Sequence, residues 1–322
     1  MRLFLFLASL GLAAAAELDV VALQRDLDNI SAEPGARIGA CVHHRATSVC
    51  IRESERFSLQ SVMKLLVGVA VLDAVDNHGW RLAQSVTIHK KDLSLFVQPL
   101  AKLVGPEGYT TNIGDLVRRA IIDSDSAATD ILIARLGGPA KVQAALVAKG
   151  IQGIRIDRDE RRLQTQIYGI EWRDEFVDAA VLERTMSAVP PSARQRSYDL
   201  YQVDPRDTAT PKGMANFLLR LAQGQLLAKS STEFVLQAMR ECKTFPDRLK
   251  AGVPGAWQIA HKTGTSGSWN GLTAATNDVG ILTAPDGGTL SIAVFVADSR
   301  LPAPQRAALI ARISAAAVKH YR

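Results

Sequence analysis

A serine and a lysine three positions apart, Ser61 and Lys64, lie at the start of an apolar run. If a helix begins at Ser61, Lys64 lies one turn further along the same face, and its amine can reach the serine hydroxyl. The helix N-terminus adds a partial positive charge that favours anionic character on that oxygen. A serine hydroxyl becomes a strong nucleophile when a nearby base, here a desolvated lysine, accepts its proton. Both residue types are common, so the pair predicts a catalytic serine only together with further motifs.

The N-terminus has the composition of a secretory signal peptide. Arg2 precedes an apolar stretch, residues 3–10, and small residues follow at 13–16. This order of a basic residue, an apolar core and a small-residue cleavage site is typical of signal peptides, and the apolar core is too short to span a bilayer. We therefore expect a signal peptide over residues 1–16, cleavage near Ala16 and a periplasmic or secreted mature chain.

Length and composition limit the class of protein. The chain has 322 residues, which suits one large domain or two intimately joined ones. The formal net charge of +6 is spread along the chain without a basic run, which argues against nucleic acid as a partner. The six histidines show no paired metal-ligand spacing, so we expect no metal and no cofactor.

Three cysteines are an odd number for a secreted protein. Cys41 and Cys50 flank a predicted β-hairpin, across which they could face each other and form a disulfide; the sequence leaves this pairing open. Cys242 would then be a leftover thiol, which we expect to be buried rather than reactive.

Hydrophobic patterning predicts an α+β protein. Both ends of the chain supply strands, and the middle is largely helical. The predicted strands cover residues 37–44, 48–52, 257–265, 279–284 and 290–297, and the predicted helices cover 17–32, 61–77, 114–149 with two breaks, 211–224, 231–241 and 303–320. We expect the strands to form one antiparallel sheet and the middle helices a second lobe, with the site in the groove between them.

Residues 165–206 are long for a connection inside a compact domain. Trp172, Phe176 and Leu182 recur near helical spacing, and the pattern ends at Pro190-Pro191. We predict a helix packed by Trp172 and Phe176 near the entrance of the site; a surface decoration away from the cleft is the alternative.

Three motifs occur in a known order. Ser61-x-x-Lys64 is followed by Ser124-Asp125-Ser126 and then by Lys262-Thr263-Gly264. This order resembles that of serine β-lactamases and penicillin-binding proteins. Glu160 follows Ser124 by 160 − 124 = 36 residues within an Arg-x-Glu-x-x-Leu pattern, as in the Ω-loop of class A β-lactamases. The segment 273–281 is similar to the PER-like extended-spectrum branch of that class.

The resemblance implies a fold of the β-lactamase and penicillin-binding-protein type. It implies an antiparallel five-stranded sheet flanked by terminal helices, and an all-helical lobe. We expect a single catalytic domain, 17–322, with an α/β lobe (17–56 and 212–322) and a helical lobe (57–211) that carries an Ω-loop at about 155–210. The resemblance also implies a monomer that acts on a small β-lactam, without stable membrane insertion.

Catalytic roles follow from the same resemblance. Ser61 is implied as the nucleophile, with the backbone N–H groups of Ser61 and Thr265 as the oxyanion hole. Lys64 is a candidate base, its ammonium form disfavoured by burial and by Lys262. Ser124 would relay a proton to the lactam nitrogen. Glu160 would activate the deacylating water.

Substrate contacts are implied in the same way. The residues implied to bind substrate or to position the water are Ser126, Gln164, Lys262, Thr263, Thr265 and Arg248. Of these, Lys262, Thr263 and Thr265 would bind the substrate carboxylate, with Arg248 as a second cation. Phe96 is a candidate aromatic at the cleft rim, and Arg158 and Asp207 are predicted to form an ion pair that closes the neck of the Ω-loop.

Two positions and one segment depart from the family pattern. Ser126 and Gln164 stand where asparagines are usual, and most of 165–206 is an insertion of roughly thirty residues into a loop that is normally short. These departures leave the nucleophile in place and leave substrate range and efficiency open.

Two related functions remain as alternatives. A D-alanyl-D-alanine peptidase of the penicillin-binding type shares the nucleophile but lacks the Ω-loop glutamate. A non-hydrolytic cell-wall-binding relative would leave the complete set of catalytic residues unexplained. An α/β-hydrolase is disfavoured because no G-x-S-x-G elbow occurs.

Overall fold

The computed structural model describes residues 16–322. Nearly all of the predicted signal peptide lies outside the described residues. The first and last described segments lie side by side, because Leu18 pairs with Tyr321 in an antiparallel bridge.

The sheet has the antiparallel strand order β2-β1-β10-β9-β7, which confirms the five predicted strands. Its strands are β1 (Arg37–His44), β2 (Thr47–Ile51), β7 (Gln258–Thr265), β9 (Leu272–Thr283) and β10 (Thr289–Ser299), and the two-residue β8 (Ser268–Trp269) pairs with β9. β9 begins at Leu272, seven residues before the predicted start. Its first half, Thr-Ala-Ala-Thr-Asn-Asp, has a weak strand pattern, and its pairing with β7 and β10 decides its conformation.

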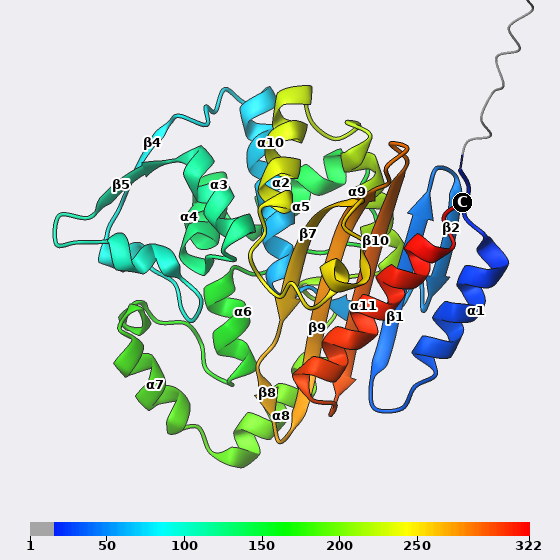
Figure 1. Ribbon diagram of the computed structural model, residues 1–322. Helices are drawn as coiled ribbons and strands as arrows, with labels where there is room; N and C mark the ends of the chain where they lie inside the picture. The colour runs from blue at the N-terminus through cyan, green and yellow to red at the C-terminus, as the bar shows by residue number, and fades with distance from the viewer. Residues whose placement is uncertain (1–15) are drawn as a thin grey trace, which may run out of the picture.

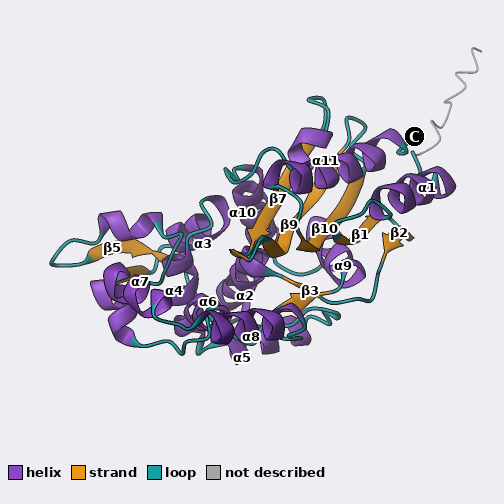
Figure 2. Cartoon of the chain, turned by 90° about the horizontal axis from the view of Figure 1, so that it is seen from below, coloured by secondary structure: helices purple, strands orange, loops and turns teal. Residues whose placement is uncertain are grey.

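Helices cover both faces of this sheet (Figures 1 and 2). The terminal helices α1 (Val20–Ser31) and α11 (Ala303–Lys319) lie on one face, and α9 (Pro211–Ala222) lies on the other. The alternation of side chains along β1 explains the two layers: Ala40 and Val42 join the core beneath α1 and α11, whereas Cys41 joins the core on the α9 side.

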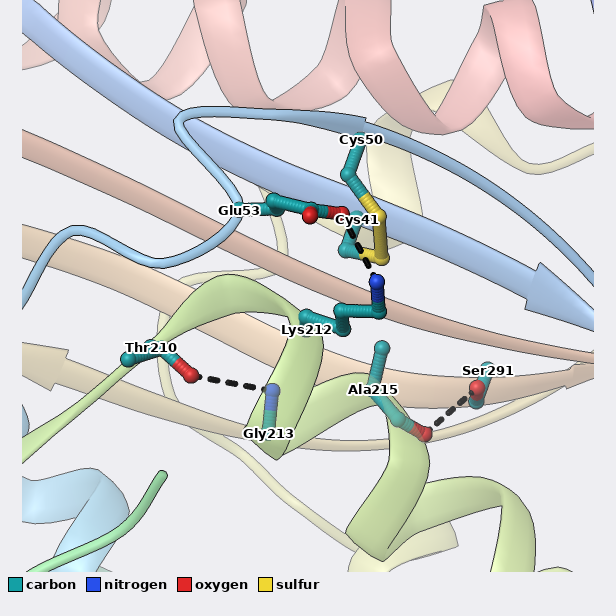
Figure 3. The surroundings of a disulfide bond; sticks show 8 residues. All are labelled: Cys41, Cys50, Glu53, Thr210, Lys212, Gly213, Ala215 and Ser291. Atoms are coloured by element: carbon teal, nitrogen blue, oxygen red, sulfur yellow. Dashed lines mark hydrogen bonds and ion pairs between the residues drawn. A yellow bond between two sulfur atoms is a disulfide. The ribbon is translucent and has the colours of Figure 1, made fainter. Parts of the chain in front are cut away.

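The Cys41–Cys50 disulfide is present (Figure 3). The two cysteines are directly opposite each other in the β1–β2 ladder, which answers the question that the sequence left open. An ion pair between Lys212 of α9 and Glu53, 3.1 Å, lies beside the disulfide on the same face of the sheet.

The second lobe surrounds α2 (Met63–Asn77). This helix has apolar residues on all sides and is buried along most of its length. The other helices of the lobe are α3 (Ile113–Ile122), α4 (Ser126–Leu136), α5 (Pro139–Ala148) and α6 (Glu160–Ile167), and α10 (Lys229–Arg240) lies beside it. Helices α3, α4, α5 and α10 pack against α2. The lobe is mainly helical and also carries a two-stranded ribbon of β4 (Ser85–Ile88) and β5 (Tyr109–Asn112).

The inserted segment folds as two helices rather than the single predicted one. A 3₁₀ turn (Asp174–Val177) leads into α7 (Ala179–Ser187), and α8 (Pro191–Gln202) follows. The prediction ended the helical pattern at Pro190-Pro191, but Pro191 is the first residue of α8, where the missing N–H of proline costs nothing. Trp172 packs edge-on against Phe176, which is buried with Leu95 and Leu182, as predicted for the packing residues.

No single helix within residues 16–322 is long and apolar enough to cross a membrane; only the bent pair α4 and α5, 74° apart, meets the length and composition criteria jointly.

Candidate active site

Ser61 lies in a 3₁₀ turn (Gln60–Val62) that continues directly into α2. The serine therefore precedes the α-helix instead of opening it, while Lys64 lies in its first turn. Gln60, beside the serine, has φ +47°, a strained conformation of the kind that accumulates at functional sites. Gly264 of β7 lies close to this turn: a Cβ on Gly264 would come within 2.6 Å of the Leu59 carbonyl oxygen. Only glycine allows β7 to approach the serine so closely.

The Ser124-Asp125-Ser126 turn joins α3 to α4. The Asp125 side chain accepts hydrogen bonds from the N–H groups of Ala128, 2.9 Å, and Leu100, 2.7 Å, and so holds the turn. Ser124 has φ +58°, and this left-handed conformation presents its carbonyl oxygen to Lys64.

Lys64 is fully buried and connects three parts of the site. Its Nζ donates to the Ser124 carbonyl oxygen at 2.6 Å and to Ser126 Oγ at 3.0 Å, and it lies 3.6 Å from Glu160 Oε1. No hydrogen bond joins Nζ to Ser61 Oγ in the described part of the chain. Hydrogen bonds of this kind often tighten only when substrate binds.

Glu160 is the first residue of α6, which Asp159 caps by accepting a hydrogen bond from the Arg162 N–H. Asp130 of α4 holds the glutamate in place, since its carboxylate accepts the Glu160 N–H at 2.8 Å. Burial and the neighbouring charges of Asp159 and Glu160 raise the pKa of Asp130 to about 7. Asp130 is not among the residues that the sequence predicted for the site. A carboxylate within the mostly apolar surface of α4 could have indicated it.

Gln164 lies one turn after Glu160. Its Nε2 donates to Gln60 Oε1 at 2.9 Å and lies 3.5 Å from Glu160 Oε2. Glu160 Oε1 is buried and accepts no hydrogen bond from the described residues. Glu160 and Gln164 line the same cavity as Ser61.

The edge of β7 carries the predicted anion-binding residues. Lys262 Nζ donates to Ser124 Oγ at 3.0 Å, and Thr263 Oγ1 lies 2.6 Å from Thr244 Oγ1. Arg248 is buried, not on the surface, and its Nη2 donates to Thr265 Oγ1 at 2.7 Å. Lys262 and Arg248 thus place positive charge close to Thr263 and Thr265. Cations beside hydroxyl donors are an arrangement that favours the binding of a carboxylate.

Three titratable side chains, those of His261, Asp278 and Cys242, lie near Lys262. His261 Nδ1 lies 3.0 Å from Asp278 Oδ1, and Cys242 Sγ lies 3.3 Å from Thr244 Oγ1. Burial disfavours the imidazolium, but the charge and hydrogen bond of Asp278 outweigh it and raise the pKa of His261 to about 10. Burial also disfavours the thiolate, yet the hydrogen bond from His261 and the charge of Lys262 lower the pKa of Cys242 to about 7. Cys242 is half-buried instead of fully buried as expected, and its reactivity stays a prediction.

One cavity of about 490 Å³ contains Ser61. Its walls include the predicted site residues other than Lys64, Lys262 and Arg248, together with the predicted rim residue Phe96 and several side chains that were not predicted. The predicted ones are Ser61, Phe96, Ser124, Ser126, Glu160, Gln164, Thr263 and Thr265; the others include Tyr168, Arg194, Thr244 and Phe245. Arg194 and Tyr168 come from the inserted segment and the end of α6, where sequence spacing gave no signal. No cluster of metal-ligating side chains occurs among residues 16–322.

The fold, together with a serine three residues before a lysine at the start of a buried helix, is that of the serine β-lactamases and penicillin-binding proteins. Residues 22–321 match the model of the Beta-lactamase enzyme family, and the chain belongs to this family. The chain is 31% identical to β-lactamase VEB-1 of Pseudomonas aeruginosa over 278 residues, 85% of this chain and 82% of the relative. It is 30% identical to the extended-spectrum β-lactamase PER-1 of the same organism, over 82% of this chain and 75% of the relative.

Solved structures agree with the sequence relatives. An ancestral (GNCA) class A β-lactamase superimposes with a TM-score of 0.73 at 29% identity, covering 92% of this chain and 99% of that one. These findings confirm the predicted class A β-lactamase and its PER-like resemblance.

Proposed function

We propose that this class A β-lactamase opens the lactam ring of penicillins and cephalosporins through an acyl-enzyme on Ser61. The observation that carries the proposal is the position of Glu160: its carboxylate lies 3.6 Å from Lys64 Nζ, within hydrogen-bonding reach of Gln164, in the cavity that contains Ser61. A serine, a lysine and a carboxylate so arranged supply a nucleophile and two candidate bases.

Acylation begins with Ser61 Oγ attacking the lactam carbonyl carbon while a base accepts its proton. Lys64 or Glu160 is the base, and the backbone N–H groups of Ser61 and Thr265 stabilise the oxyanion. Ser124 Oγ, 3.0 Å from Lys262 Nζ, then delivers a proton to the lactam nitrogen as its bond to the carbonyl carbon breaks.

Substrate orientation depends on the edge of β7. Lys262, Thr263 and Thr265 bind the carboxylate of the substrate, and Arg248 adds a second positive charge behind Thr265. Ser126 faces the acyl side chain of the substrate. The serine side chain is shorter than that of the usual asparagine, and its hydroxyl already accepts a hydrogen bond from Lys64.

Deacylation requires a base that activates water. Glu160 accepts the proton of a water that Gln164 helps to position, and the resulting hydroxide attacks the ester carbonyl carbon and releases Ser61. This step separates the proposed hydrolase from a penicillin-binding peptidase, which remains acylated.

The chain is proposed to act in the periplasm or outside the cell as a monomer. The signal-like N-terminus and the Cys41–Cys50 disulfide support an oxidising compartment.

A steady-state assay of the purified mature chain with a chromogenic cephalosporin tests the proposal. Turnover that is lost in Ser61→Ala supports it. Turnover by Ser61→Ala equal to that of the wild type, or no turnover by the wild type, contradicts it.

A further inference from the structure

Arg194 of α8 is a buried cation in the wall of the active-site cavity. Only 4% of the residue is exposed, although arginine is rarely so buried without a partner. Its Nη1 donates to the Ile167 carbonyl oxygen, which uses one of the five N–H donors of the guanidinium.

The guanidinium has aromatic neighbours instead of an acidic one. Its central carbon lies 3.5 Å from the centre of the Tyr168 ring and 5.2 Å from that of Trp269. No carboxylate of residues 16–322 forms an ion pair with it, and burial lowers the pKa of Arg194 against the weak opposing effect of Tyr168 and Tyr198. The rings offset part of the cost of burying the charge, but an anion would offset far more.

The chain that follows β7 relates the position of Arg194 to that of the proposed carboxylate site at Thr263 and Thr265. The Tyr168 hydroxyl is 3.9 Å from where a Cβ on Gly267 would lie, so the Arg194 stack lies beside Gly267. Gly267 is four residues beyond Thr263, which corresponds to about 13 Å of extended chain. Arg194 therefore lies along the same cavity wall as Thr263 but apart from it, and Ser61 and Glu160 line the same cavity.

We propose that Arg194 forms a second anion subsite, which binds a carboxylate at the far end of the acyl side chain of a β-lactam. This inference rests on the proposed function and specifies its substrate class: dianionic β-lactams, with one carboxylate at Thr263 and Thr265 and the other at Arg194. The planar guanidinium, held by Tyr168 and Ile167, presents its remaining N–H donors to that carboxylate.

The test compares two substrates that differ by one charge: a cephalosporin whose oxyimino side chain ends in a carboxylate, and its methyl ester. The ratio of their kcat/KM values is measured for the wild type, Arg194→Gln, Arg194→Lys and Arg196→Gln. Arg196 is an exposed arginine on the same helix and serves as the matched control. We expect the wild type to prefer the carboxylate. The preference should fall about tenfold in Arg194→Gln and remain within about twofold in Arg196→Gln.

Arg194→Lys separates anion binding from a structural role. Lysine keeps the charge but loses the stacking, so it should retain most of the preference if the subsite exists. An unchanged ratio in Arg194→Gln, or equal losses in the lysine and glutamine variants, overturns the inference. If Arg194→Gln does not fold, a wild type without preference for the carboxylate, or a lysine variant without one, overturns it as well. If the wild type hydrolyses neither compound, the proposed function fails, and the inference falls with it.

Discussion

Arg158 and Asp207 form a buried ion pair at the neck of the predicted Ω-loop, with 2.6 Å between Arg158 Nε and Asp207 Oδ2. The same carboxylate accepts the N–H groups of Asp157 and Arg158, so it fixes the backbone two residues before Glu160. This confirms the predicted pair. Burial nevertheless raises the pKa of Asp207 despite the arginine, which indicates that the pair shapes the loop more than it adds net stability.

Asp207→Asn should therefore impair both turnover and folding. The amide keeps one acceptor but removes the nearer of the two carboxylates that face the buried Arg158, and only Asp204, 3.1 Å from Nη2, remains as a counter-charge. We expect kcat to fall at least about tenfold and the free energy of unfolding to fall by about 2 kcal/mol. Arg162→Gln, which removes an exposed ion pair in the same loop, is the control and should change stability by less than about 0.5 kcal/mol. Equal effects of the two substitutions would show that the Arg158–Asp207 pair contributes no more to turnover or stability than an exposed ion pair does.

Asp130 should make stability depend on pH. Its pKa is about 7 in the folded chain and 3.8 when exposed, so the folded state holds this proton more tightly. The stabilisation is complete below the unfolded pKa and is lost as the pH rises through about 7. Between about pH 5.5 and about pH 8, urea unfolding should show the wild type losing about 2 kcal/mol more than Asp130→Asn. Parallel pH curves for the two proteins would contradict this assignment.

Lys262 should limit activity at alkaline pH. Burial lowers the pKa of Lys262 to about 8, and the charge of Lys64 acts in the same direction. The ammonium, which we propose binds the substrate carboxylate, is present below this pKa and lost above it, so kcat/KM should fall above about pH 8. Lys262→Arg keeps its charge throughout, and its alkaline limb should move to higher pH. An unmoved limb would mean that another group titrates.

Cys242 should react as a thiolate near neutral pH. The rate of alkylation by iodoacetamide should rise through about pH 7, and His261→Gln should move this midpoint upward, because the hydrogen bond that favours the thiolate is removed. Cys242→Ser identifies the labelled residue. A wild-type midpoint at the ordinary thiol pKa would contradict the contribution of His261.

The sequence predicted those parts of the site that depend on local motifs. Ser61 and Lys64 lie one helical turn apart, and this arrangement follows from their spacing alone. Asp125, next to Ser124 in the sequence, caps the helix that follows. Glu160 and the β7 residues were placed by resemblance to a family, because contacts between distant elements follow from the fold and not from spacing.

The remaining features depend on tertiary packing, which periodicity does not report. The start of β9 at Leu272 depends on pairing on both sides, and α8 begins at a proline that also reads as a helix stop. The burial of Arg194 depends on the ring of Tyr168 at the end of α6, 26 residues before it, and on that of Trp269 in β8, 75 residues after it. No local pattern around Arg194 predicts that arrangement.

The role of Glu160 in deacylation is tested most directly by intact mass spectrometry of Glu160→Gln after mixing with a penicillin. Glutamine cannot accept the proton of the attacking water, so the ester on Ser61 should persist. We expect a stable adduct on Glu160→Gln with the added mass of the whole penicillin, and none on the wild type at the same time point. A wild type that stays acylated for hours, or a Glu160→Gln variant that clears its adduct as fast as the wild type, would contradict hydrolysis through Glu160.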